Sequence, residues 1–149
     1  MPQENLKKIV HVHLPADEKF TSTLNAGSHQ LVADEPESAG GNNEGPDPYD
    51  YLLMSLGSCS LMTVKMYAQR KKWKLGDLYM ELRHHKNHEE DCLHCEDPES
   101  KMDKIEKEVI VEGDLTDEQL DKLLEISKKC PVHRTLMSDI NIESSISCK

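Results

Sequence analysis

The sequence predicts an α+β protein with antiparallel sheets around two main helices. Short segments with period-two alternation of apolar and polar residues lie on both sides of one long apolar segment at helical spacing. The predicted order is three strands, a helix, two strands, a second helix and a last strand. Runs of strands interrupted by only two helices favour α+β over a doubly wound parallel sheet. A chain of 149 residues has the size of one domain, so we expect a single domain over residues 1–149.

The first three strands are predicted to form a small antiparallel sheet. Residues 7–14 place three apolar side chains at alternate positions, which predicts a half-buried strand. Residues 19–24 and 28–33 are two further strand candidates, and an Asn-Ala-Gly turn signal lies between them.

A long helix is predicted from Pro48 to about Lys72. The segment before it is rich in Gly, Pro and Asn, Asp47 is a favourable N-cap, and Pro48 suits the first helical position. Nearly the whole circumference up to Tyr67 is apolar or small. We therefore expect this helix in the middle of the structure and Cys59 buried or half-buried within it.

Two long paired strands and a second helix are predicted next. Residues 77–85 and 104–112 alternate apolar and polar side chains. The sequence Thr-Asp-Glu-Gln at 116–119 is a capping box, which predicts a helix that runs to Lys129 and ends at the following Cys-Pro. Residues 140–146 are the predicted final strand.

Composition and charge exclude several classes of protein. The 18 Lys and Arg against 28 Asp and Glu give a net charge of −10, which argues against a partner that is a nucleic acid. No apolar run approaches the ~20 residues of a membrane helix, and residues 1–8 lack the apolar core of a secretory signal. We expect a cytoplasmic protein with no membrane partner. Aromatic residues make up only 4%, so burial of apolar surface in a homo-oligomer is also expected.

The cysteines are the main candidates for chemistry, and they stand at positions 59, 92, 95, 130 and 148. In a reducing compartment such thiols are more often catalytic, metal-binding or merely buried than paired in structural disulfides. An ordinary thiol, with a pKa of about 8.5, is only a few per cent thiolate at neutral pH, so a reactive cysteine needs a cation or hydrogen-bond donors nearby. The alternative is structural, with Cys59 a small buried helix residue and Cys130 a helix terminator.

Two segments together carry a resemblance to a known family. Residues 48–70, which contain Gly-Ser-Cys59-Ser, and the segment Cys130-Pro-Val-His-Arg-Thr-Leu136 closely resemble the OsmC/Ohr family of osmotically induced and organic hydroperoxide resistance proteins. The Gly-rich segment before residue 48 fits as well, and with the strand order the resemblance spans roughly residues 25 to 146. It implies an OsmC-like α+β fold and an intertwined homodimer with the central helices packed across the interface.

The resemblance also implies a thiol-dependent peroxidase that reduces organic hydroperoxides. In active members one cysteine attacks the peroxide and becomes a sulfenic acid, and a second condenses with it to a disulfide that a dithiol reduces again. By motif position, Cys59 would be the attacking residue and Cys130 the resolving one. The implied partners are a second copy of the chain, a small organic hydroperoxide or other apolar small molecule, and a dithiol reductant, with no cofactor required.

The sequence departs from the family at the groups that hold the thiolate. Active reductases use an arginine from the N-terminal half and a glutamate about ten residues before the first cysteine. Here Tyr49 stands ten residues before Cys59, Asp50 is the nearest acid, and no arginine precedes Arg70. The candidate replacements for the missing cation are His29, His133 and Arg134.

A second cluster of cysteine and histidine lies between the two long strands. Cys92 and Cys95 form a Cys-x-x-Cys pair, and His88 and His94 could complete a tetrahedral Zn²⁺ site. The pair is similar to one found in a subgroup of OsmC proteins. A redox dithiol and an exposed polar hairpin tip are the alternatives. As a whole, the alternative to an enzyme is a binding module of OsmC fold, with an apolar small molecule in the dimer groove or Zn²⁺ at this hairpin.

Overall fold

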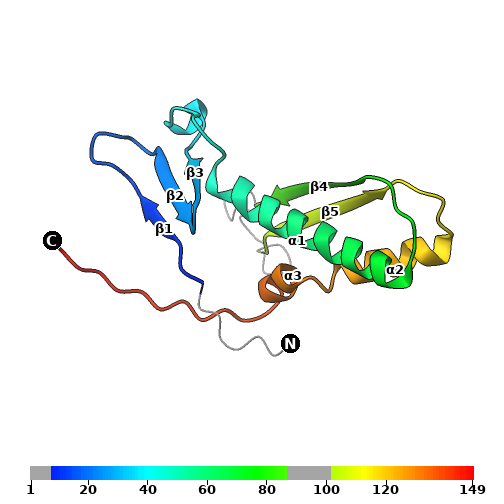
Figure 1. Ribbon diagram of the computed structural model, residues 1–149. Helices are drawn as coiled ribbons and strands as arrows, with labels where there is room; N and C mark the ends of the chain where they lie inside the picture. The colour runs from blue at the N-terminus through cyan, green and yellow to red at the C-terminus, as the bar shows by residue number, and fades with distance from the viewer. Residues whose placement is uncertain (1–7, 87–101) are drawn as a thin grey trace, which may run out of the picture. The chain divides into compact units, whose positions relative to one another are not determined.

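The computed structural model describes residues 8–86 and 102–149 (Figure 1). The chain divides into two compact units, Met1–Leu52 and Leu53–Lys149, and their boundary falls inside the long helix α1. None of the helices in the described ranges is both long and apolar enough to cross a membrane.

The N-terminal unit holds a three-stranded antiparallel sheet in the order β1-β2-β3. The strands are β1 (His11–His13), β2 (Ser22–Ala26) and β3 (His29–Ala33). Ala26 lies opposite His29, so the hairpin between β2 and β3 has a two-residue loop that begins at Gly27 with φ +60°. A positive φ of this kind is typical of tight hairpin turns, and the predicted antiparallel sheet is confirmed.

The first strand is shorter and more exposed than predicted. β1 comprises three residues at the edge of the sheet, and Val10 and Val12 are 65% and 67% exposed. The expectation of a half-buried strand is wrong for this chain, because the alternating pattern finds the strand but does not supply a layer to cover its apolar face.

The loop before α1 is organised around one buried carboxylate. Asp34 is 2% exposed and accepts hydrogen bonds from Thr21 Oγ1 at 2.8 Å, from the Glu35 N–H at 2.7 Å and from the Glu44 N–H at 3.1 Å. These hydrogen bonds hold the pKa of Asp34 below its ordinary value, although burial alone would raise it. A short 3₁₀ helix, η1 (Glu37–Ala39), lies within the loop.

Helix α1 (Pro48–Lys71) confirms the predicted long helix. Its start is fixed by reciprocal bonds, in which Asp47 Oδ1 accepts from the Asp50 N–H at 2.8 Å and Asp50 Oδ2 accepts from the Asp47 N–H at 3.0 Å. The helix continues unbroken through Gly57, so Cys59 lies in its interior.

One stripe of α1 is buried, although the sequence predicts this helix in the middle of the structure, and Cys59 is half-buried as expected. The buried residues are Leu56, Gly57, Ser60, Val64 and Ala68. On other faces Met54, Met62 and Met66 are 48%, 63% and 58% exposed. The apolar circumference of α1 is therefore not matched by burial on every face among the described residues.

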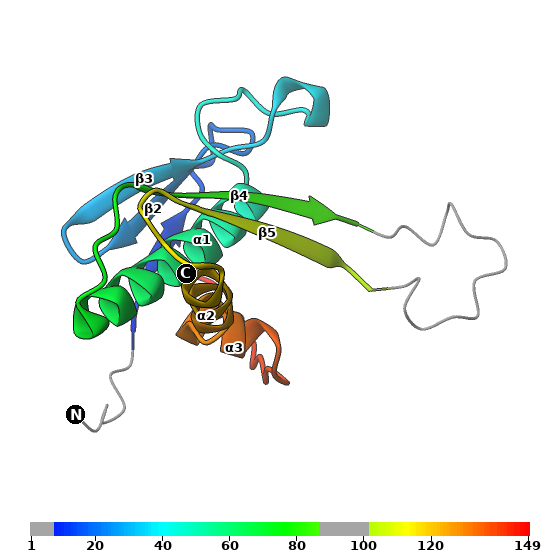
Figure 2. The same cartoon turned by 90° about the vertical axis from the view of Figure 1, so that its right-hand side faces the viewer.

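The C-terminal unit packs α1 against the hairpin of β4 (Leu78–His85) and β5 (Lys104–Val111). The two strands are antiparallel as predicted, with Leu82 opposite Lys107. A Cβ atom added at Gly57 would lie 2.8 Å from Leu82 Cδ1, so the glycine allows α1 to approach β4 closely. Helix α2 (Asp117–Ser127) lies on the same face of the hairpin as α1 (Figures 1 and 2). The predicted capping box of Thr116 and Gln119 is present at its start.

The last part of the chain differs from the prediction in two ways. Helix α2 ends at Ser127, within two residues of the predicted end, but an additional helix, α3 (Pro131–Leu136), follows with Cys130 as its N-cap. The proline that ends one helix also suits the first position of the next. Residues 140–146 form no strand and are exposed, because no strand in the described part of the chain pairs with them.

Candidate functional site

The structure brings two of the predicted site residues together. Cys59 comes from the interior of α1 and is half-buried, whereas Cys130 at the N-cap of α3 is 0% exposed. Both are free thiols, and they are near enough for each to shift the pKa of the other. The pair therefore consists of one thiol that solvent can reach and one that it cannot.

Cys130 is held by donors from two elements. Its Sγ accepts the backbone N–H of His133 at 3.2 Å, the usual capping bond at the start of a helix. Ser60 Oγ of α1 lies 3.3 Å from the same sulfur and is itself fully buried.

A lysine that the sequence analysis did not identify completes the cluster. Lys107 of β5 is half-buried, and its Nζ lies 3.0 Å from each of three acceptors, Ser60 Oγ, the carbonyl oxygen of Ser127 and His133 Nδ1. An ammonium group can only donate, so all three acceptors receive hydrogens from Lys107. His133 is then neutral with its hydrogen on Nε2, and the hydroxyl hydrogen of Ser60 is left to point at the Cys130 sulfur.

The surroundings of Cys130 favour its anionic form. Burial alone would raise the pKa of this thiol, but donors from Ser60 and His133, contact with Cys59 and the charge of Lys107 together lower the pKa below the ordinary value. Hydrogen bonding to a charged form always shifts the equilibrium toward that form.

The surroundings of Cys59 act in the opposite direction. Burial is the largest cause and raises the pKa of Cys59, and the neighbouring Cys130 sulfur raises it further. The backbone N–H of Val132 lowers this pKa but does not reverse the shift. The Thr63 hydroxyl donates its hydrogen to the Cys59 carbonyl oxygen at 2.8 Å, so that hydrogen is not directed to the sulfur.

The two basic groups of the cluster both have lowered pKa values. Burial is the main cause for Lys107, and the positive charge of Lys128 adds to it, while the two thiols partly offset the shift. Burial also lowers the pKa of His133, and the charges of Lys107 and Lys128 lower it further.

Asp50, His29 and Arg134 are three further residues with predicted roles in the site. The Asp50 carboxylate is occupied in capping the first turn of α1, and His29 is exposed on β3. Arg134 is exposed on α3 and is not among the groups that shift the pKa of either cysteine. The roles predicted for these three residues therefore stay predictions.

The predicted zinc cluster lies outside the described residues. This applies to the whole predicted set, Cys92, Cys95, His88 and His94. Within residues 8–86 and 102–149, no three side chains of His, Cys, Asp or Glu gather as a metal site.

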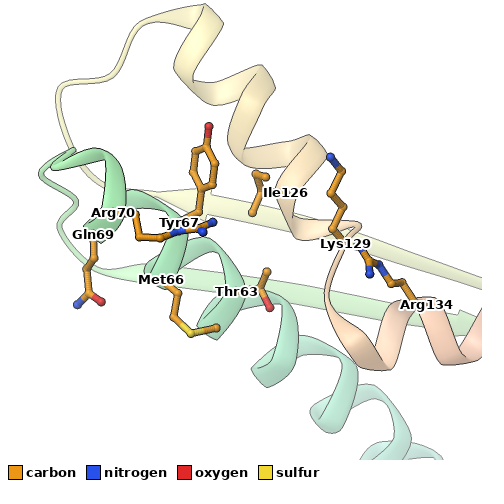
Figure 3. Close-up of a pocket in the computed structure, with 8 residues that line it drawn as sticks. All are labelled: Thr63, Met66, Tyr67, Gln69, Arg70, Ile126, Lys129 and Arg134. Atoms are coloured by element: carbon orange, nitrogen blue, oxygen red, sulfur yellow. The ribbon is translucent and has the colours of Figure 1, made fainter. Parts of the chain in front are cut away.

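A pocket of about 730 Å³ lies between α1 and the α2–α3 segment (Figure 3). It is lined by Thr63, Met66, Tyr67, Gln69, Arg70, Ile126, Lys129 and Arg134. Arg70 stacks 5.8 Å from the centre of the Tyr67 ring, and Lys129 pairs with Glu125 at 3.1 Å. The pocket thus combines an apolar lining with positive charge in a chain whose net charge is −10.

One signal in the sequence could have identified Lys107. The inward positions of β5 are held by Ile105, Lys107, Val109 and Val111, so the lysine interrupts an apolar face. A charge at such a position is rarely buried without polar partners. Ser60, in contrast, gave no signal beyond its small size beside Cys59.

Comparison with known proteins identifies the fold. A sequence profile described as OsmC-like protein matches residues 41–145. An OsmC-like protein from Mycoplasma pneumoniae has a similar structure, with a TM-score of 0.70, 20% identity, and coverage of 90% of this chain and 89% of the other. No curated protein matches the chain by sequence.

Two more distant structures carry functional descriptions. A Legionella pneumophila protein described as an organic hydroperoxide resistance protein, OsmC, has a TM-score of 0.60 and 17% identity, with 90% of this chain and 91% of the other covered. A Vibrio cholerae protein described as a putative organic hydroperoxide resistance protein, with captopril in one of its active sites, has a TM-score of 0.57 and 14% identity, with 93% and 92% covered. At these identities the likeness establishes the shared fold.

Proposed function

Because the chain belongs to the OsmC-like family, we propose that it is a thiol-dependent peroxidase that reduces organic hydroperoxides through Cys59 and Cys130. The observation that carries the proposal is the meeting of two free thiols beside a half-buried ammonium group. The description of the Legionella protein as an organic hydroperoxide resistance protein supports the substrate class.

The difference in exposure supports the two proposed roles. Cys59 is the thiol that a substrate can reach, so its sulfur attacks the peroxide, the O–O bond breaks, and an alcohol leaves. Cys130 then attacks the sulfenic acid on Cys59, a disulfide forms, and the hydroxyl leaves as water. An external dithiol returns the disulfide to two thiols and becomes oxidised itself.

A cumene hydroperoxide consumption assay tests this proposal. The wild-type protein with a dithiol reductant should consume the peroxide repeatedly, and Cys59→Ser should not. Cys130→Ser should reach the sulfenic acid and then depend on the external thiol for its removal. Cys148→Ser is the matched control, since Cys148 is an exposed free thiol near the end of the chain. A wild-type rate no faster than that of Cys59→Ser would overturn the proposal.

The homodimer belongs to the same proposal. The exposed methionines of α1 are apolar side chains that a second copy of the helix could cover. The cytoplasmic location expected from the sequence fits a thiol pair that must be reduced after each turnover.

A binding module is the second candidate function, and the pocket beside α1 is the observation that favours it. Its lining of apolar and basic side chains suits a small molecule with an apolar body and an anionic group. Isothermal titration with captopril, the compound described in the Vibrio cholerae structure, tests this alternative. Binding without any peroxide turnover would favour the module, whereas turnover in the assay above favours the enzyme.

A further inference from the structure

We infer that the negative charge of the reduced thiol pair resides on Cys130, where Lys107 and Ser60 hold it, and that Cys130 acts as the base that accepts the Cys59 proton. The inference rests on the proposed function and assigns the proton within the same site. It makes Lys107 and Ser60 positioning residues, which act through Cys130.

The hydrogen bonds around Cys130 favour a thiolate at its sulfur. The His133 N–H donates to the Cys130 sulfur at 3.2 Å. Because Lys107 Nζ donates to Ser60 Oγ at 3.0 Å, Ser60 keeps its own hydrogen available for the Cys130 sulfur at 3.3 Å. A sulfur that receives two donors is arranged as an acceptor, and thiolate accepts far better than a thiol.

The positive charge of Lys107 also favours a thiolate at Cys130. All three hydrogen-bond partners of this half-buried ammonium are neutral, and none of the ion pairs in residues 8–86 and 102–149 involves it. A charge taken out of water is expensive unless an opposite charge is near. Cys130, one hydroxyl group away, can supply that charge as a thiolate.

The remaining groups that face the cluster agree with this assignment. They are Cys59 from α1, the neutral His133 of α3 and the cationic Lys128 at the end of α2. None of them offers a competing anion except Cys59, and two donors, the His133 N–H at 3.2 Å and Ser60 Oγ at 3.3 Å, lie at the Cys130 sulfur. We therefore assign a proton shared between the two sulfurs to Cys59, whose surroundings also raise its pKa.

This distribution defines a balanced reaction. As the Cys59 sulfur attacks the peroxide, its proton passes to the Cys130 thiolate and from there to the departing alkoxide, so that the products are an alcohol and Cys59 sulfenic acid. Cys130 is again a thiolate and attacks the sulfenic sulfur, expelling hydroxide that takes up a proton to become water. The peroxide is reduced by two electrons, and the two cysteines are oxidised to the disulfide.

Titration of the thiolate by ultraviolet absorbance tests the inference without any turnover. The background protein carries Cys92→Ser, Cys95→Ser and Cys148→Ser, so that only the pair titrates. In this background Cys59→Ser should keep a thiolate that titrates below the ordinary thiol pKa of about 8.5, and Cys130→Ser should lose it. The reverse pattern, or a low-pKa thiolate in neither variant, would overturn the inference even if the protein proves to be a peroxidase.

A second set of variants tests the positioning residues. Lys107→Met should raise the pKa of the remaining thiolate in the Cys59→Ser protein, and Lys104→Met is the matched control because Lys104 is exposed on the same strand. Ser60→Ala should act in the same direction if Lys107→Met does not fold. An unchanged titration in a folded Lys107→Met or Ser60→Ala protein would contradict the role assigned to the altered residue.

Discussion

His133 connects the candidate site to the stability of the fold. Its Nδ1 accepts a hydrogen bond from Lys107 at 3.0 Å, and its backbone N–H donates to the Cys130 sulfur at 3.2 Å. The imidazole must stay neutral for the first of these bonds, because a protonated ring has no acceptor. Burial and the neighbouring lysine charges lower its pKa accordingly.

The stability of the protein should therefore depend on pH through His133. The unfolded histidine, with a pKa of about 6.5, takes up a proton at higher pH than the folded one does, so this stabilisation is complete above that value and is lost as pH falls through the folded pKa. Urea unfolding at several pH values should show a shallower loss of stability toward acid pH for His133→Gln than for wild type. His29→Gln, an exposed histidine, is the control. An identical pH dependence for wild type and His133→Gln would contradict this role.

The elements differ in how far their sequences specify them. The start of α1 and the capping box of α2 could be predicted, because the residues that fix them are adjacent in sequence. The hairpin of β4 and β5 was predicted from alternation alone. Helix α3 was missed, since the Cys-Pro step that ends α2 carries equally good signals for a new start. The strand predicted at residues 140–146 does not form, because an alternating pattern needs a neighbouring strand to make a sheet.

The N-terminal cap of helix α2 allows a prediction about stability that does not involve the thiol pair. Thr116→Ala removes the side chain that accepts the Gln119 N–H at 3.1 Å, and loss of such a cap costs about 0.5–2 kcal/mol. Chemical denaturation should show this loss for Thr116→Ala but not for Thr116→Ser, which keeps the hydroxyl. Because the cap lies at the opposite end of α2 from Ser127 and Cys130, the thiolate titration should not change. A shifted titration would show that the cap also controls the site.

At the scale of the whole molecule, many large apolar side chains of the described residues are exposed. Met62 and Met66 on α1 are examples, and Ile142 in the C-terminal segment is 80% exposed. The low aromatic content and the resemblance both predicted a homodimer. The paired cysteines could likewise be predicted from their motifs, whereas the cation could not, because Lys107 is far from both cysteines in sequence and only the folded hairpin brings it to them.

The dimer can be tested by placing a charge on the exposed face of α1. Met62→Glu should shift the protein toward monomer in sedimentation equilibrium, because burying a carboxylate against the partner helix is unfavourable. Lys65→Gln, an exposed change on the same helix, should leave the association state of the wild-type protein unchanged. A wild-type protein that is monomeric at all concentrations would contradict the dimer, as would a Met62→Glu protein that associates as strongly as wild type.

The pairing of Cys59 with Cys130 is tested most directly by disulfide mapping. Reduced protein is treated with one equivalent of cumene hydroperoxide, quenched by alkylation and digested, and its peptides are identified by mass. We expect a cross-linked peptide that joins Cys59 to Cys130, and none in the Cys59→Ser or Cys130→Ser proteins. Peroxide consumption that leaves Cys130 as a free, alkylated thiol while Cys59 accumulates as sulfinic or sulfonic acid would contradict the pair.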